Sequence, residues 1–238
     1  MTHPNRSTAL AVALTLAMSC LASGGQQFRD EFDDGDLLDD QPVSWQFDQL
    51  DGDGGAMGIT DEALEIRLDG GVASATSQLG GNDRIYGDAS IRTQITIVDR
   101  ETFLAGGIFG RSSPAGVYGI SISQAGRVSF FGPNFEMVDD VSFNPANKNA
   151  VNLRLDMIGP EISVSVWEAS ASEPAIPMWQ VTDHDLSNGA IGVFANSGPG
   201  VNRWVQFAHF EVVPEPSSLA MAFLSSLGAL AVWRRRPR

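Results

Sequence analysis

The sequence predicts an all-β fold, a two-sheet antiparallel jelly-roll sandwich, for the body of the chain at residues 24–212. Three observations predict it. Apolar and polar residues alternate in one short segment after another, which is the period of a strand with one buried face. Clusters of Gly, Asn, Asp and Pro separate these segments, as turns do. The body contains no long stretch of helical periodicity and no fixed-period repeat, which argues against a propeller or a β-helix.

The expected strands follow one another along the body, each with its apolar residues on one face. Leu64, Ile66 and Leu68 share a face in the segment "ALEIRLD". The dipeptide Gly159-Pro160 predicts a hairpin turn between two alternating segments. The other expected strands lie at 90–98, 117–123, 127–131, 151–157, 162–166, 190–195 and 204–212.

Several of these segments, in this order, resemble the laminin-G and concanavalin A-like jelly rolls. "FRDEFDDGDL" with "SWQF" is similar to the opening of such domains, and "GGIFGRS" with "VYGISISQAGRVSFF" to their central strands. "NLRLDMIGPEISVSVWE" and "GAIGVFAN" resemble the hairpin and back strand that follow. The last strand of such domains often contains Phe-Asp-Asn-Phe, whereas this chain has Ala208 and His209 at the two middle positions.

Residues 1–23 have the three parts of a secretory signal peptide. Arg6 lies in a short polar region, an apolar run extends from Ala9 to Ala22, and small residues follow. The partner implied is a signal peptidase, cutting after Ala22 or Gly24. Cys20, the one cysteine of the chain, would be removed with this segment. The alternative is a lipoprotein with a lipidated Cys20, which the missing leucine three positions earlier disfavours.

The C-terminal segment 213–238 joins a proline-bracketed glutamate, an apolar run and an arginine cluster. The run from Leu219 to Trp233 would span about 22 Å as a helix, short of the ~30 Å of a bilayer core. It has no polar face, so a terminal helix packed on the body fits poorly. The three parts, Pro214-Glu215-Pro216, the apolar run, and Arg234, Arg235, Arg236 and Arg238, resemble the PEP-CTERM sorting signal.

This resemblance implies an address. It implies export across the inner membrane of a Gram-negative bacterium, transient membrane insertion oriented by the arginines, and cleavage near the Pro-Glu-Pro by an exosortase. The body would then remain at the cell surface or in the extracellular matrix. The expected organisation is a signal peptide at 1–23, a jelly roll at 24–212 and a sorting signal at 213–238.

The body is strongly acidic. Only Arg6 and the four terminal arginines among the 15 basic residues, and only Glu215 among the 29 acidic residues, lie outside it, which leaves a formal charge of −18 within it. Such a surface repels phosphate backbones, so nucleic-acid binding is not expected. Without Cys20 the body has no thiol, and its two histidines, His184 and His209, are too few for a zinc site.

The acidic opening "RDEFDDGDLLDD" suggests two kinds of chemistry. Asp30 and Asp34 share a strand face, and concanavalin A-like domains often hold a structural calcium near this position, but Ala208 lacks the carboxylate expected from the last strand. A solvated acidic edge is the favoured alternative. Glu31 and Asp33 would lie about 7 Å apart on the other face, within the spacing of glycosidase carboxylates. The segment from Glu31 to Asp36 resembles the Glu-x-Asp-x-x-Glu pattern of laminarinase-type jelly rolls, but Asp36 replaces the second glutamate. Glu31 and Asp33 are therefore only weak catalytic candidates.

For binding, the expected residues are aromatic, because an exposed ring can stack on the apolar face of a sugar. Trp179 in an expected loop, and Tyr118 together with Arg111, are the candidates. Trp45, Trp167 and Trp204 are expected in the core. The sequence thus favours a non-catalytic carbohydrate-associated or interaction module in an exopolysaccharide layer. The alternatives are a glycan hydrolase of the same fold and a purely structural matrix protein.

Overall fold

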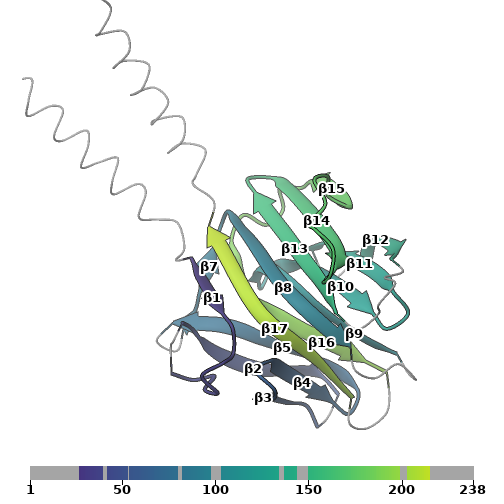
Figure 1. Cartoon of the computed structure of the whole chain (residues 1–238). Coiled ribbons are helices and arrows are strands. Elements are labelled where there is room, and N and C mark those ends of the chain that lie inside the picture. The colour runs from purple at the N-terminus through teal and green to yellow at the C-terminus, as the bar shows by residue number, and fades with distance from the viewer. Residues whose placement is uncertain are drawn as a thin grey trace, which may run out of the picture.

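The computed structural model describes residues 27–39, 42–52, 54–79, 82–97, 103–133, 137–143, 150–198 and 203–214, and these form two antiparallel sheets packed face to face (Figure 1). The expected signal peptide and most of the expected sorting signal lie outside the described residues. The all-β sandwich predicted from the alternation is confirmed.

The first sheet, which we call the β8–β17 sheet, is ordered along one path with one strand beside it. Its order is β15 (Trp179–Thr182), β14 (Glu161–Glu168), β13 (Val151–Ile158), β8 (Ala89–Ile97), β17 (Arg203–Pro214), β4 (Leu64–Leu68) and β3 (Ala56–Ile59), and β1 (Phe28–Asp30) pairs with β17.

The second sheet, the β9–β16 sheet, covers the inner face of the first. Its order is β12 (Met137–Ser142), β11 (Arg127–Phe131), β10 (Gly116–Ser123), β9 (Leu104–Ser113), β16 (Gly189–Ser197), β5 (Gly71–Leu79) and β2 (Ser44–Asp51), while β6 (Asn82–Asp83) pairs with β5 and β7 (Ile85–Tyr86) with β16.

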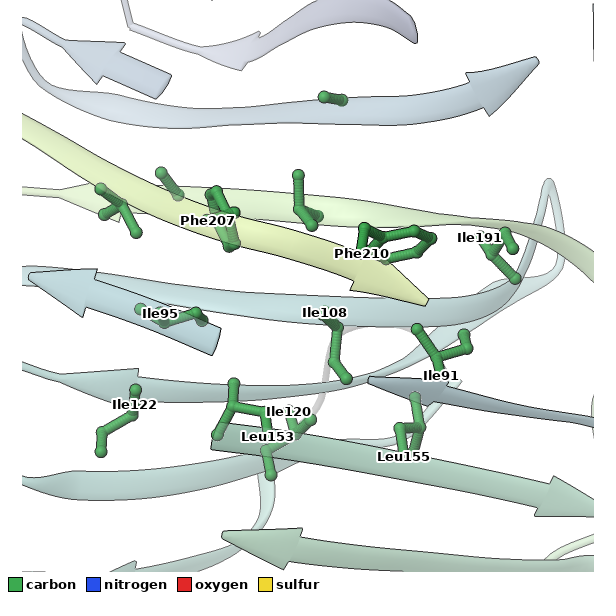
Figure 2. Packing of buried hydrophobic residues seen from close by; sticks show 14 of the residues in the cluster. Ile91, Ile95, Ile108, Ile120, Ile122, Leu153, Leu155, Ile191, Phe207 and Phe210 are labelled. Atoms are coloured by element: carbon green, nitrogen blue, oxygen red, sulfur yellow. The ribbon is translucent and has the colours of Figure 1, made fainter. Parts of the chain in front are cut away.

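Alternation in the sequence places one face of each strand in the core between the sheets. Leu64, Ile66 and Leu68 of β4 are fully buried there, as predicted. Figure 2 shows Ile91 and Phe207 of the first sheet and Ile108 of the second among the side chains of one buried cluster. Burying a side chain of this size contributes roughly 1.5–3 kcal/mol, so this continuous apolar layer stabilises a body that has no disulfide.

The predicted hairpin at Gly159-Pro160 is confirmed. Ile158 pairs with Glu161 across the two turn residues, and Gly159 has a φ of +56°, a left-handed conformation that glycine adopts at little cost. The segment around Trp179 differs from expectation. It forms strand β15, paired with β14 so that Trp179 lies opposite Val164, where the sequence suggested a loop.

Strand β1 fastens the start of the body to both sheets. Its backbone pairs with β17. The carboxylate of Asp30, the last residue of β1, accepts a hydrogen bond of 2.8 Å from the indole Nε1 of Trp45 on the opposite sheet. The Trp45 ring meets Phe210 edge-on with centroids 5.1 Å apart, and Phe32 lies 5.7 Å away on centroids. A buried polar bridge inside an aromatic cluster therefore fixes the N-terminal strand.

The two ends of the described chain meet at one pole of the sandwich. Phe28 of β1 pairs with Val212 of β17, and Pro214 pairs with Ala89 at the start of β8. Strand β17 thus continues two residues beyond the expected end of the body at 212. The proline-bracketed segment begins inside strand β17, since Pro214 follows the buried Val212 after a single residue.

We expect Val212→Ala to lower the free energy of unfolding by about 2 kcal/mol, because Val212 is fully buried and its truncation leaves a cavity. Val213→Ala is the matched control, since Val213 lies on the other face of β17 and is only half-buried. Chemical denaturation of both variants measures the difference. Equal losses would contradict the placement of Val212 in the core.

Candidate functional site

A groove with a volume of about 790 Å³ lies on the outer face of the β9–β16 sheet, away from the core. Strand alternation explains its position. In β16 the side chains of Ile191, Val193 and Ala195 point into the core, so those of Phe194 and Asn196 face outward. We call it the outer groove. It is lined by Asp48, Leu50, Asp51, Val72, Ser74, Thr76, Asp83, Ile85, Phe109, Ser112, Ser113, Pro114, Val117, Gly119, Phe131, Asn188, Gly189, Ala190, Phe194 and Asn196.

Phenyl rings and glycines alternate across the floor of the outer groove. Phe194 pairs with Gly107 on β9, and Phe109 pairs with Gly192 on β16. A Cβ at Gly107 would lie 2.7 Å from Cε1 of Phe194, and one at Gly192 would lie 2.7 Å from Cζ of Phe109. Each ring therefore lies against the backbone of the neighbouring strand, which only a glycine permits. The floor is apolar and aromatic.

A third ring extends this floor to β11. The Phe131 and Phe194 rings are 6.1 Å apart on centroids at an interplanar angle of 77°, an edge-to-face pair. Both rings are partly exposed, whereas Phe109 is nearly buried. Partly exposed, fixed phenyl rings are suited to stack on the apolar face of a sugar ring.

Carboxylates line the part of the outer groove that β2, β5 and β6 form, and two amides outside the lining hold them. The Gln46 Nε2 donates to Asp48 at 3.1 Å, and the Gln78 Nε2 donates to Asp83 at 3.2 Å. Gln78 also donates to the side-chain oxygen of Gln46, so the two amides link the two carboxylates. A carboxylate has four lone-pair sites, so Asp48 and Asp83 retain capacity to accept hydrogen bonds from a ligand.

Arg111 is buried beneath the part of the outer groove that Ser112 to Pro114 and Asn188 line. One extra residue in β9 forms a bulge against both neighbours, and Arg111 has a φ of +50° there. Its buried guanidinium donates to the carbonyl oxygens of Gly87 at 3.1 Å and Leu186 at 3.0 Å. It also pairs with the Asp88 carboxylate at 3.2 Å. These contacts hold the two loops that precede β8 and β16.

The side chains of Arg111 and Tyr118, which the sequence suggested as ligand contacts, are both buried. The side chain of Tyr118 is fully buried in the core, and burial raises the pKa of its hydroxyl to about 12. Burial also lowers the pKa of Arg111, while the nearby Asp88 carboxylate raises it. Arg111 contributes to the outer groove by holding the loop that leads to Asn188 and by its neighbours Ser112 to Pro114, which line the groove.

Trp179 lies at the edge of the sandwich, outside the outer groove. Its ring is 4.0 Å from that of Phe130 on centroids, and it packs partly buried against the core cluster. This contact joins β15 of one sheet to β11 of the other. Of the tryptophans expected in the core, Trp45 is fully buried, whereas Trp167 and Trp204 are half-buried on the outer face of the β8–β17 sheet.

The described carboxylates of the acidic opening segment accept local hydrogen bonds. Asp30 accepts hydrogen bonds from Trp45 with one oxygen and from the Phe32 backbone with the other, and burial raises its pKa. The Asp34 carboxylate accepts from the backbone N–H of Asp36 in a turn. Within the described ranges, no group of three or more His, Cys, Asp or Glu side chains is arranged to hold a metal ion.

The weak catalytic candidates lie outside the outer groove. Glu31 is exposed and pairs with Arg29, which lowers the pKa of Glu31. Asp33 is exposed in the following loop. Neither belongs to the groove lining, so the structure does not bring them to an aromatic floor. His184 is exposed, and burial lowers the pKa of the half-buried His209.

Sequence reasoning missed the three phenylalanines of the floor. A signal for two of them exists, because Gly107-x-Phe109 and Gly192-x-Phe194 have the same spacing. In a strand this spacing places the glycine and the ring on one face. Two such segments in neighbouring antiparallel strands can pair glycine against ring, but the sequence does not state which strands are neighbours.

Solved structures with a similar fold include a carbohydrate binding module, a lectin and a β-glucanase. The carbohydrate binding module CBM66 from Bacillus subtilis matches at a TM-score of 0.51 and 16% identity, covering 68% of this chain and 91% of that one. Lectin I-B4 from Griffonia simplicifolia matches at 0.56 and 11%, covering 80% and 99%. The β-glucanase of Bacillus licheniformis matches at 0.57 and 12%, covering 81% and 100%. These likenesses concern the fold, which is concanavalin A-like. No curated protein matches the sequence.

The C-terminal segment matches a family model, the PEP-CTERM protein-sorting motif, over residues 212–236. The chain carries a PEP-CTERM motif. The resemblance stated from the sequence is thereby confirmed, and the motif implies an exported cell-surface protein that an exosortase processes.

Val212, Val213 and Pro214 belong to both the PEP-CTERM motif and strand β17. The other predicted motif residues, Glu215, Pro216, Arg234, Arg235 and Arg236, lie outside the described residues. Across the part of the chain that is described, no helix is long and apolar enough to cross a membrane.

Proposed function

We propose that this chain is an exported, exosortase-processed protein of the cell surface whose outer groove binds an extracellular polysaccharide without cleaving it. The PEP-CTERM motif supports the address. The observation that carries the binding role is the groove itself, an aromatic floor beside hydrogen-bonding carboxylates and amides. This combination is suited to sugars, whose rings have apolar faces and polar edges.

The location of the groove supports binding of a chain rather than of a single small molecule. The floor crosses β16, β9 and β11, and the polar part continues over β5 and β2 of the same sheet. A ligand that spans these strands contacts both parts at once. Such extended contact is what an oligosaccharide offers, with several rings to stack and several hydroxyl groups to bond.

The purified full-length chain, in a detergent without a sugar headgroup, would be screened on a glycan array with and without a chelator. We expect binding that survives chelation, because the groove needs no metal in this proposal. Phe194→Ala is expected to weaken the affinity for the best glycan at least about tenfold, since a stacking ring at the centre of a site is a typical hot spot.

Phe103→Ala is the matched control, because it removes the same atoms from an exposed ring outside the groove. Phe131→Ala provides a second floor variant, and the thermal midpoint of each variant shows that it is folded. Absence of binding to any glycan would overturn the proposal. Release of reducing ends from a bound glycan would support the hydrolase alternative instead.

A further inference from the structure

The charge of the outer groove has one sign. Its lining includes the carboxylates of Asp48, Asp51 and Asp83, and none of the described residues that line it is lysine, arginine or histidine. The chain as a whole has a formal charge of −14, so the groove lies in a negative field. Carboxylates at a binding surface attract cationic groups and repel anionic ones.

The three carboxylates come from different register positions along β5, since Asp48 lies opposite Ser74, Asp51 opposite Val72 and Asp83 opposite Gln78. Asp48 and Asp51 come from β2 and Asp83 comes from β6, and both strands pair with β5. Asp51 accepts from the backbone N–H of Gly52, while Asp48 and Asp83 accept from Gln46 and Gln78. Among the described residues, these three carboxylates do not form a group that could hold a metal ion. Separated carboxylates suit separate cationic groups spaced along a polymer.

We propose that the outer groove selects polysaccharides that carry free amino groups, such as de-N-acetylated hexosamine polymers, over neutral or uronate-containing ones. This rests on the proposed function. The apolar face of each sugar ring stacks on the phenyl floor of Phe194 and Phe131. The protonated amino groups at the ring edges then donate to the carboxylates of the β2 and β6 side.

The size of the expected preference follows from exposure. Asp51 and Asp83 are exposed and Asp48 is partly exposed, so each ion pair with a ligand is modest and sensitive to salt. Together three such pairs correspond to a preference of about tenfold for the amino form over its N-acetylated counterpart. A uronate oligomer of the same length is repelled by the same three groups.

Isothermal titration of the full-length chain tests this with three hexasaccharides: a β-1,4-glucosamine oligomer, its fully N-acetylated counterpart and a galacturonate oligomer. We expect the amino form to bind about tenfold more tightly than the N-acetylated form, and the uronate to bind most weakly. Raising the salt concentration from 50 to 500 mM should remove most of this difference, because the Debye length falls to a few ångströms.

A triple variant, Asp48→Asn/Asp51→Asn/Asp83→Asn, is expected to bind the amino and N-acetylated forms equally. The matched control, Asp33→Asn/Asp61→Asn/Glu62→Gln, removes the same charge from exposed positions outside the groove and is expected to keep the preference. Loss of the preference in both triple variants would assign it to the overall field of the protein and overturn the groove assignment.

The remaining outcomes separate this inference from the proposed function. Equal binding of neutral and amino oligomers by the unmodified chain leaves the glycan-binding role standing and overturns the selectivity. Binding of none of the three oligomers, together with a blank glycan array, overturns both. Tight uronate binding that requires calcium and disappears in the groove triple variant would overturn the selectivity in favour of a cation-bridged anionic glycan.

Discussion

Replacing Trp45 with alanine is expected to lower the free energy of unfolding by about 4 kcal/mol. Trp45 is 1% exposed and packs against Phe32 and Phe210. Its truncation opens a large cavity between the sheets. It also leaves the buried Asp30 carboxylate without the indole N–H that it accepts from.

Trp45→Phe separates the two contributions. Phenylalanine keeps most of the apolar volume and removes the donor, so the loss should fall to roughly 1–2 kcal/mol. Trp204→Ala is the control, because Trp204 is half-buried on the outer face beneath the guanidinium of Arg67. Urea denaturation of the three variants measures the differences. Similar losses for Trp45→Ala and Trp204→Ala would contradict the central place of the Asp30–Trp45 bridge.

Arg111→Met is expected to cost about 3 kcal/mol and to weaken glycan binding at the same time. Methionine keeps the apolar stem, but the carbonyl oxygens of Gly87 and Leu186 lose the guanidinium as a donor, and the Asp88 carboxylate keeps only the backbone N–H of Gly159. Buried acceptors without partners cost about 1–3 kcal/mol each, partly relieved here because Asp88 is 24% exposed on its side chain.

The control for Arg111 is Arg29→Met. Arg29 is 45% exposed on its side chain and forms surface ion pairs with Glu31 and Glu211, so its loss should cost less than about 1 kcal/mol. Arg29 lies outside the outer groove, and its replacement should leave glycan affinity unchanged. Unchanged affinity in Arg111→Met, measured by titration below its unfolding midpoint, would show that the Asn188 and Ser112–Pro114 loops do not depend on Arg111.

The sandwich could be predicted from local alternation, because burial on one face of a strand leaves a period of two in the sequence. The same rule places Tyr118 correctly when it is applied strictly. Tyr118 alternates with Val117 and Gly119 and shares its face with Ile120 and Ile122, so it belongs to the core. The expectation that it faces a ligand came from its chemistry and conflicted with the period of its own strand.

Arg111 and the groove floor depend on features that alternation does not contain. The bulge at Arg111 reverses the direction of one side chain, and a single extra residue is visible only once the neighbouring strands are paired. The contact of Phe194 with Gly107 likewise requires the register between β16 and β9, which are far apart in the sequence. The register between strands far apart in the sequence determines which side chains meet in the outer groove. The local alternation determines only which face of each strand is buried between the sheets.

The pairing of Phe28 with Val212 has a mechanical consequence for an exported protein of this kind. If both ends serve as attachments before processing, each pulls on the sandwich from the same pole, and the two strands that bear the load are hydrogen-bonded neighbours. Cleavage at one end removes one attachment, and the remaining attachment still leaves the body at the same end of the sandwich.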